Sequence, residues 1–382
     1  ASLTLAAYRN VSMTTGTTIA NNGAGNLTLR ADASGIDNGG SVTNSGTIDW
    51  SKSTGIVSAL YDMNGSNSPG TLISNGAWQA PLYSGLLTQM TGYQLVNSVT
   101  DLQNVANNMA GNYALGKDID ASNYAFTTLG TLLFAITTPF TGQFDGMRHT
   151  IANIAPSDNS VFGDIGPHGV VRNVNVNANT GGVYGTFEGV GVLAVYNYGT
   201  VLNVFTSGVN VWPVRGGGVS RAGLVGTNYG LIARSGSSAS VQADDEAAGL
   251  VNYNYGTIDQ SYATGSVVGT LSHSGAGGLV DGNSGTISQS FAAGPVSAGT
   301  PQFAGGICAG LCSGVFGNDV YWNVETTGQA SGGGNLAASN GLTSAQMSNP
   351  ASFAGWDFGP NGAWAMPPGA THPVLSWQVA PH

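Results

Sequence analysis

Charged side chains are scarce in this 382-residue chain. They make up 7% of the residues, against about 25% in a typical soluble domain. Nine Lys and Arg residues against nineteen Asp and Glu residues give a formal net charge of -10, and no basic run occurs. Because nucleic acids and anionic membranes attract clustered basic side chains, we exclude both as partners.

Long apolar runs are also missing. No stretch approaches the roughly 20 apolar residues needed to cross a bilayer. The first residues, ASLTLAAYRNVSMTT, lack the charged start and following apolar block of an intact signal peptide. We therefore expect a mature piece or a fragment of a larger protein. Cysteine is rare as well, and two residues do not identify the redox compartment by number alone.

The chain contains, instead, a repeated sequence motif. AGLVNYNYGTIDQSYATGSV (248–267) recurs as GGLVDGNSGTISQSFAAGPV (277–296). The tripeptide motif Asn-x-Gly marks four clear copies of the repeat. Their glycines are 31, 26 and 29 residues apart: Gly199, Gly230, Gly256 and Gly285. A period of about 20–50 residues is typical of a solenoid, whose units bury their apolar faces against their neighbours.

Each repeat predicts short strands. The copies contain short apolar runs broken by Gly, Asn and Ser, and they lack an apolar stripe of helical period. A parallel β-helix follows, with equivalent positions of successive coils about 4.8 Å apart. Like charges at that spacing repel by about 1 kcal/mol even in water, whereas stacked Asn, Ser and Thr bond along the column. This geometry explains the low content of charge.

Two segments differ from the coils. SVTDLQNVANNMAG predicts one short helix near 99–110, with Ser98 or Thr100 as its N-cap and Gly111 after its end. The tail contains Trp356, Trp364 and Trp377, and we expect it to form an irregular cap over the open end of the column. An aromatic ligand patch is the alternative reading of this tail.

We divide the chain into four segments on these grounds. They are N-terminal coils with a connecting segment (1–92), a helix and strands leading into the repeats (93–160), the repeat β-helix (161–325), and a Gly-rich linker with the cap (326–382).

The repeats resemble a known motif. GLVNYNYGTIDQSYATGSV and GLVDGNSGTISQSFAAGPV resemble the GLUG motif, and residues 223–226 (GLVG) match its core most fully. The N-terminal LTLAAYRNVSM and GNLTLRAD are similar to filamentous-haemagglutinin-like passenger proteins of two-partner secretion. The resemblance implies a right-handed parallel β-helix, exported with an outer-membrane secretion partner. It also implies display on the surface of a Gram-negative bacterium, commonly for adhesion.

Catalytic motifs are lacking, and we expect no enzyme and no cofactor. No H-E-x-x-H or G-x-S-x-G string occurs, and the five histidines have no ligand spacing. A carbohydrate-active β-helix enzyme is the strongest enzymatic alternative, because such enzymes place carboxylates on adjacent coils. Its best cluster here consists of Asp118, Asp120, Asp145, Arg148 and His149.

Two further sites have open alternatives. The acidic run Asp244, Asp245 and Glu246 offers carboxylate oxygens to calcium, although we favour a solvated loop because the calcium-binding nonapeptide is absent. Cys308 and Cys312 stand four apart in GGICAGLCSG. We favour a disulfide over two buried thiols, because export is oxidising.

The sequence therefore predicts a secreted or cell-surface adhesin segment that binds a protein or glycan of a host or neighbouring cell. Five repeat aromatics form the expected ligand surface if they point outward; packing inside as stacks is the alternative: Tyr229, Tyr253, Tyr255, Tyr262 and Phe291. A structural filament formed by self-association is a second hypothesis, favoured by the low charge and stackable shape.

Overall fold

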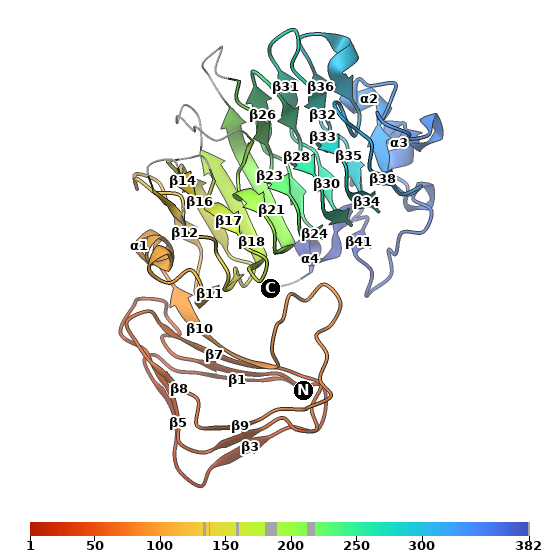
Figure 1. Ribbon diagram of the computed structural model, residues 1–382. Coiled ribbons are helices and arrows are strands. Elements are labelled where there is room, and N and C mark those ends of the chain that lie inside the picture. Colours follow the sequence, from red (N-terminus) through yellow and green to blue (C-terminus); the bar gives the residue numbers. More distant parts are fainter. Residues whose placement is uncertain (133–134, 137, 158–159, 180–188, 212–217, 381–382) are drawn as a thin grey trace.

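The computed structural model describes residues 1–132, 135–136, 138–157, 160–179, 189–211 and 218–380. Its strands pair in parallel from one coil to the next, which confirms the predicted parallel β-helix (Figure 1). Two short pairs are antiparallel: β13 (Thr131–Leu132) with β14 (Ala135–Ile136), and β41 (Trp364–Ala365) with β42 (Val374–Leu375). In the described part of the chain, no helix is long and apolar enough to span a membrane.

The first coils have three sheets, drawn in red and orange in Figure 1. The main sheet begins with β1 (Leu3–Ala6), β4 (Leu27–Arg30), β7 (Val57–Asp62) and β10 (Met90–Val96). The other two sheets consist of β2 (Val11–Met13), β5 (Val42–Asn44) and β8 (Asn67–Ser68), and of β3 (Thr18–Ala20), β6 (Thr47–Asp49) and β9 (Thr71–Ile73).

The main sheet continues through the later coils because β10 also pairs with β11. Its further strands are β11 (Asn112–Leu115), β12 (Ile119–Asp120), β15 (Gln143–Asp145), β16 (Thr150–Ile154), β18 (Val170–Asn179), β21 (Thr200–Val211), β24 (Leu231–Ala233), β25 (Gly236–Ser237), β26 (Ser240–Ala243), β29 (Thr257–Asp259), β30 (Tyr262–Ala263), β31 (Val267–Gly269), β34 (Thr286–Ser288), β35 (Phe291–Ala292), β36 (Val296–Ser297), β38 (Val315–Phe316), β39 (Tyr321–Asn323) and β40 (Gly341–Leu342).

Two five-stranded sheets complete the repeat coils. One contains β17 (Phe162–Ile165), β20 (Ala194–Asn197), β23 (Val225–Asn228), β28 (Val251–Asn254) and β33 (Val280–Asn283). The other contains β19 (Val190–Gly191), β22 (Arg221–Ala222), β27 (Ala247–Ala248), β32 (Ala276–Gly277) and β37 (Ala304–Gly305).

Like residues lie above one another inside the column. Ile232 pairs with Ile258 and Ile258 with Ile287, and all three side chains are fully buried. Stacking identical side chains in register fills the narrow interior without voids, because each coil presents the same shape to the next. The core of the fold is therefore built from equivalent residues of successive sequence repeats.

Buried amides form a second ladder at the end of one sheet. The Nδ2 atom of each asparagine donates to the Oδ1 atom of the next, at 2.8 Å in all three steps, through Asn197, Asn228, Asn254 and Asn283. The four side chains are essentially inaccessible to solvent. Because every amide in the middle of the row both donates and accepts, the polar groups are satisfied without any charge.

The predicted helix is present but shorter than expected. The helix α1 runs from Val99 to Asn104 and continues as a 3-10 turn, η1 (Val105–Asn107). The hydroxyl of Ser98 accepts a hydrogen bond from the backbone N–H of Asp101, so Ser98 is the N-cap. The regular turns end three residues before 110, where Asn108 leaves helical geometry.

The C-terminal part of the chain closes the end of the column. Three 3-10 turns and three short α-helices occur from residue 301 onward: η2 (Pro301–Phe303), α2 (Val324–Thr327), η3 (Ala338–Asn340), α3 (Ser344–Met347), η4 (Pro350–Ser352) and α4 (Ser376–Val379). The end of the column is closed by backbone: β40 pairs with β39, and the carbonyls of Ser331 and Gly332 accept hydrogen bonds from residues 306–308.

The tryptophans of the tail lie on the side of the column instead of over its end. Trp356 and Trp364 pack with Phe353 against the outward rings of Tyr262 and Phe291. The tail then runs back along the coils, where Trp377 Nε1 donates to the carbonyl of Arg234 at 2.9 Å. In Figure 1 the blue β41 and α4 lie beside β24 and β34. The predicted Trp-rich C-terminal segment is therefore present, and its tryptophans cover the outward aromatic side chains of the sheet.

We predict that Asn228→Ala destabilises the protein more than Asn283→Ala. Removing Asn228 leaves Asn254 Oδ1 without a donor, at about 1–3 kcal/mol for a buried orphan, and Asn197 Nδ2 keeps only a longer bond of 3.3 Å to the carbonyl of Leu231. Asn283 ends the row, and its own Nδ2 has no partner. Urea unfolding midpoints of the two variants measure the difference, and an equal loss would contradict the ladder as a source of stability.

Candidate functional site

Three tyrosines form an exposed row along the repeat coils. The rings of Tyr198 and Tyr229 are stacked with centroids 4.9 Å apart, and those of Tyr229 and Tyr255 with centroids 5.0 Å apart. The interplanar angles are 3° and 8°. The three side chains remain 41%, 46% and 52% exposed. The row is therefore the most regular aromatic surface of the described residues.

The Asn-x-Gly motif positions each ring of the row. The asparagine points inward into the buried amide ladder. The glycine lies against the preceding coil, where a Cβ on Gly230 or Gly256 would meet a backbone carbonyl at 2.1 or 2.2 Å. The residue between them is directed outward because both neighbours are held against the column. Since the amide ladder fixes the distance between coils, the outward rings stack.

Stacking decides which parts of the rings a ligand can reach. The ring faces cover one another, so the row presents ring edges and phenolic hydroxyls. The outer face of Tyr255 has no further ring above it, because Ser284 holds the equivalent place in the next coil. A shallow pocket of about 50 Å³ lies here, lined by Tyr253, Asn254, Tyr255, Gly282, Ser284 and Leu311. Leu311 is 73% exposed at its rim.

The five predicted aromatics separate into different environments. Tyr229 and Tyr255 belong to the exposed row. Tyr253 lies at the pocket, half-buried, and burial together with the nearby Glu246 raises the pKa of its phenol. Tyr262 and Phe291 are buried under the tryptophans of the tail, so the prediction that they face a ligand is wrong. They do point outward from the coil, but the chain itself covers them.

The predicted calcium run 244–246 is engaged by the neighbouring coil. Asp244 is buried and its Oδ1 accepts a hydrogen bond from the N–H of Val219 at 2.9 Å. A carboxylate oxygen of Glu246 accepts one from the hydroxyl of Ser220. Asp244 thus lies inside the protein and not in a solvated loop, since its carboxylate holds the backbone of the adjacent turn.

A further carboxylate, Asp281, is enclosed beside this run. It is 3% exposed, and its Oδ1 has no hydrogen-bond partner. Burial raises its pKa to about 7, and the charges of Glu246 and Asp245 contribute to the shift. The ionised carboxylate of Asp281 therefore destabilises the folded protein at neutral pH.

Cys308 and Cys312 are joined in a disulfide, with their Cα atoms 6.2 Å apart. The bond closes the turn next to Leu311, at the rim of the pocket beside Tyr255. Ladder bridges connect Val280 with Cys308 and Asn283 with Cys312, so the disulfide loop continues the sheet that carries the amide ladder. It thus fixes the last turn beneath the pocket.

The predicted enzymatic cluster is divided between two places. His149 Nδ1 lies 3.1 Å from Asp118 Oδ1, and Asp120 accepts a hydrogen bond from Asn153 Nδ2 at 3.0 Å. Asp145 is instead buried in an ion pair with Arg172, at 2.9 Å between Nη2 and Oδ2. The carboxylate that the enzymatic reading needs beside Asp118 is therefore engaged elsewhere.

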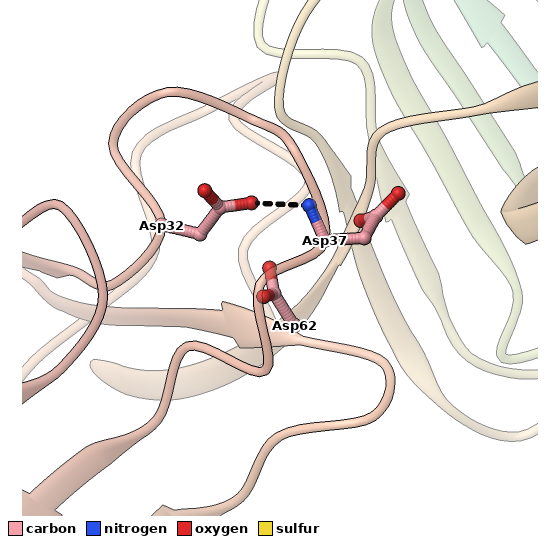
Figure 2. Close-up of side chains that lie close together, drawn as sticks. All are labelled: Asp32, Asp37 and Asp62. Atoms are coloured by element: carbon pink, nitrogen blue, oxygen red, sulfur yellow. Dashed lines mark hydrogen bonds between the residues drawn. The ribbon is translucent and has the colours of Figure 1, made fainter.

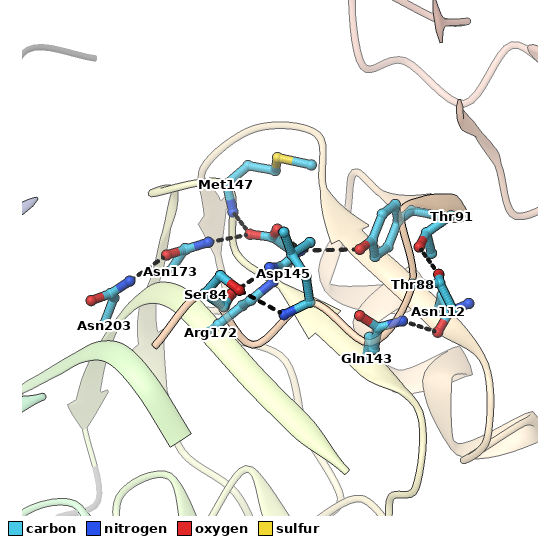
Figure 3. A network of polar contacts seen from close by, with 12 residues as sticks. Ser84, Thr88, Thr91, Asn112, Gln143, Asp145, Met147, Arg172, Asn173 and Asn203 are labelled. Atoms are coloured by element: carbon cyan, nitrogen blue, oxygen red, sulfur yellow. Dashed lines mark hydrogen bonds and ion pairs between the residues drawn. The ribbon is translucent and has the colours of Figure 1, made fainter. Parts of the chain in front are cut away.

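Figure 3 shows what surrounds this buried ion pair. Asp145 Oδ1 accepts hydrogen bonds from the N–H of Met147 and from Asn173 Nδ2. Arg172 Nη1 donates to the carbonyl of Ser84 at 2.6 Å, which ties the loop before β10 to the later coils. Every polar partner in this network is a structural group of the coil or loop, and the arrangement explains why the pair tolerates burial.

Sequence analysis missed one cluster of carboxylates. Oxygen atoms of Asp32, Asp37 and Asp62 lie within 4.8 Å of one another in the N-terminal coils (Figure 2). Asp32 and Asp62 are buried, and Asp37 is partly exposed. A signal was present: Asp32 and Asp62 are 30 residues apart, which is one coil, since Arg30 pairs with Leu60. Comparing acidic residues at the coil period would have found the cluster.

Comparisons with known proteins reveal two similarities. In sequence the chain is 30% identical over 178 residues to halomucin from Haloquadratum walsbyi, covering 42% of this chain and 2% of halomucin. In structure it is similar to a candidate immunoglobulin A1 protease from Bacteroides ovatus, with a TM-score of 0.52 and 19% identity, over 75% of this chain and 92% of that one. At this identity the structural likeness shows the fold alone.

No protein-family model matches the chain. The resemblance to GLUG-motif and filamentous-haemagglutinin-like proteins therefore stays a prediction, as do the Gram-negative source and two-partner secretion. The match to halomucin spans a small fraction of a much longer protein. The β-helix with its repeats is what the comparisons and the structure share.

We predict that Asp281→Asn stabilises the protein at high pH more than at low pH. The raised pKa means that folding favours the protonated acid, so the wild-type protein loses stability as pH rises from about 4 through about 7. The amide has the same shape and no charge. The gain at pH 8 over that at pH 5 should be on the order of 2–3 kcal/mol. Unfolding at both pH values measures it, and a gain independent of pH contradicts the assignment.

Proposed function

We propose that this chain is a non-catalytic segment of a secreted or cell-surface protein, whose β-helix acts as a stalk and presents a binding surface. The observation that carries the proposal is the exposed row of Tyr198, Tyr229 and Tyr255. Tyrosine is enriched in protein interfaces because it combines apolar area with a polar tip and few rotatable bonds. An unpartnered row of three such rings is unusual on a surface that carries few charges.

A protein partner fits this surface better than a glycan. Aromatic rings bind sugars through their faces, and the faces of this row are covered by stacking. The ring centroids recur every 4.9–5.0 Å along the row. This matches the distance of about 4.8 Å between neighbouring strands of a sheet, so a partner that presents stacked strands or their turns fits the row. The pocket beside Tyr255 and the exposed Leu311 supply an apolar anchor at one end. We therefore infer that the ligand lies along the row with one side chain at the pocket.

The alternatives have less support. Head-to-tail stacking into filaments requires open ends, and the C-terminal end is closed by β40 and by residues 331–332. A carbohydrate-active enzyme requires paired carboxylates in a cleft, and Asp145 is held by Arg172. The disulfide accords with an oxidising compartment outside the cell.

Binding to a panel of immobilised extracellular proteins and to a glycan array tests the proposal. We expect saturable binding to one or more proteins, weakened at least about tenfold by Tyr229→Ser and by Tyr255→Ser, because central aromatic residues dominate interfaces. Tyr8→Ser is the matched control, since Tyr8 is 67% exposed on the first coils and lies far from the row in the chain.

Equal loss in all three variants, or no loss in any, contradicts the assignment of the row. Saturable binding to glycans alone, sensitive to Tyr255→Ser, would replace the protein partner by a sugar that stacks on the free face of Tyr255. Circular dichroism of each variant verifies that the fold is retained.

A further inference from the structure

The three aspartates of the N-terminal coils are brought together by coil stacking. Asp32 follows β4, Asp62 ends β7, and Asp37 lies in the turn after Asp32. The next coil adds Asn97, directly after β10, whose Leu95 pairs with Asp62. Residues from three successive coils therefore meet at one corner of the column.

The carboxylates of this corner are held in place by backbone. Asp32 Oδ2 accepts hydrogen bonds from the N–H groups of Ile36 and Asp37, at 2.8 and 2.9 Å. Asp62 Oδ2 accepts one from the N–H of Gly40 at 2.7 Å. The positions of the two buried side chains are thus determined by the fold.

No base neutralises the corner directly. Within the described residues, no Lys, Arg or His nitrogen lies within 4.0 Å of these three carboxylates. Arg30 and Lys117 are near, but their hydrogen bonds go to the carbonyls of Gly116 and Gly35, each at 2.6 Å. Burial and the neighbouring aspartates raise the pKa of Asp62 to about 6. The corner is an accumulation of negative charge in a protein that otherwise avoids charge.

Asn97 is a second, independent sign of a ligand. Its side chain is buried at 2% exposure and aimed at the carboxylates, with Nδ2 at 3.2, 2.8 and 3.5 Å from oxygens of Asp32, Asp37 and Asp62. An amide nitrogen carries two hydrogens and cannot serve three carboxylates. The Oδ1 atom of Asn97 has no hydrogen-bond partner at all. In this orientation Oδ1 lies against Gly35 and Gly116. Turning the amide by 180° would direct this oxygen to the carboxylates, where a bound cation would satisfy it together with them.

We propose that Asp32, Asp37, Asp62 and Asn97 form a binding site for a calcium ion. The donors are oxygen atoms alone, which hard cations prefer. Oxygen atoms about 2.4 Å from a central ion lie at most about 4.8 Å from one another, which matches the spread of the three carboxylates. Magnesium, with oxygen ligands at about 2.1 Å, would require the cluster to contract.

The site has a route to solvent. A polar pocket of about 530 Å³ adjoins Asp37 and is also lined by Asp101, Asn64, Gln94 and Asn104, among others. A cation can enter along this side, and water molecules in the pocket can complete a coordination number of six to eight. The ion would join three coils at one corner and so lock the N-terminal coils to the chain that follows them.

Calorimetric titration of the chelator-treated full chain with calcium chloride tests the proposal. We expect one ion per chain, with a dissociation constant of about 1 mM or tighter, the range of extracellular calcium modules. Asp37→Asn should weaken binding at least tenfold. This variant spares the fold, because the amide oxygen of an asparagine at position 37 can still accept the hydrogen bond from Asn97 Nδ2. Asp120→Asn is the control, since that carboxylate is exposed and lies outside the corner.

Thermal unfolding separates binding from a structural role. Calcium should raise the melting temperature of the wild type and of Asp120→Asn, and it should leave Asp37→Asn unchanged. Without calcium, Asp37→Asn should melt at or above the wild-type temperature, because it removes repulsion. The proposal is overturned if the wild type binds no calcium at several times about 1 mM, or if Asp37→Asn binds as well as the control.

Discussion

The structure depends on the parallel pairing of equivalent residues in successive coils. Each coil buries its apolar side chains only against the coils above and below it, so a residue that fits once must fit again one period later. Ile232, Ile258 and Ile287 fill the interior in this way. The same constraint disfavours charge, because a repeated charged residue would stack on its own copy about 4.8 Å away.

The candidate binding surface follows from this constraint. The amide ladder from Asn197 to Asn283 sets the spacing of one edge of the column. Each outward tyrosine stands between a ladder asparagine and a glycine in the sequence. The tyrosine rings therefore repeat at the spacing of the ladder, and they stack. A surface of repeated rings is therefore a consequence of the core, and its length can change by adding coils without redesigning the fold. That property suits a protein that extends from a surface and presents contacts along its length.

Sequence reasoning succeeded where the physical signal is local or periodic. The Asn-x-Gly period predicted the parallel coils, and the two candidate N-caps, Ser98 and Thr100, helped to predict the helix α1, which begins after Ser98. It failed where distant segments fold onto the coils. Tyr255 and Tyr262 both point outward from one repeat, and only the position of the tail decides that Tyr262 is buried. The tail carries no pattern that indicates which side it covers. The Asp32, Asp37 and Asp62 corner was missed because it combines a loop of one coil with the end of a strand in the next, and only the coil spacing between Asp32 and Asp62 marks it in the sequence.

Nuclear magnetic resonance of the full chain with labelled isoleucine methyl groups tests the stacking most directly. Assignment by single Ile→Val variants identifies Ile232, Ile258 and Ile287. In-register coils predict nuclear Overhauser contacts from the methyl group of Ile258 to those of both Ile232 and Ile287. The absence of these contacts, or a direct contact between Ile232 and Ile287 that bypasses Ile258, would contradict the column of like residues.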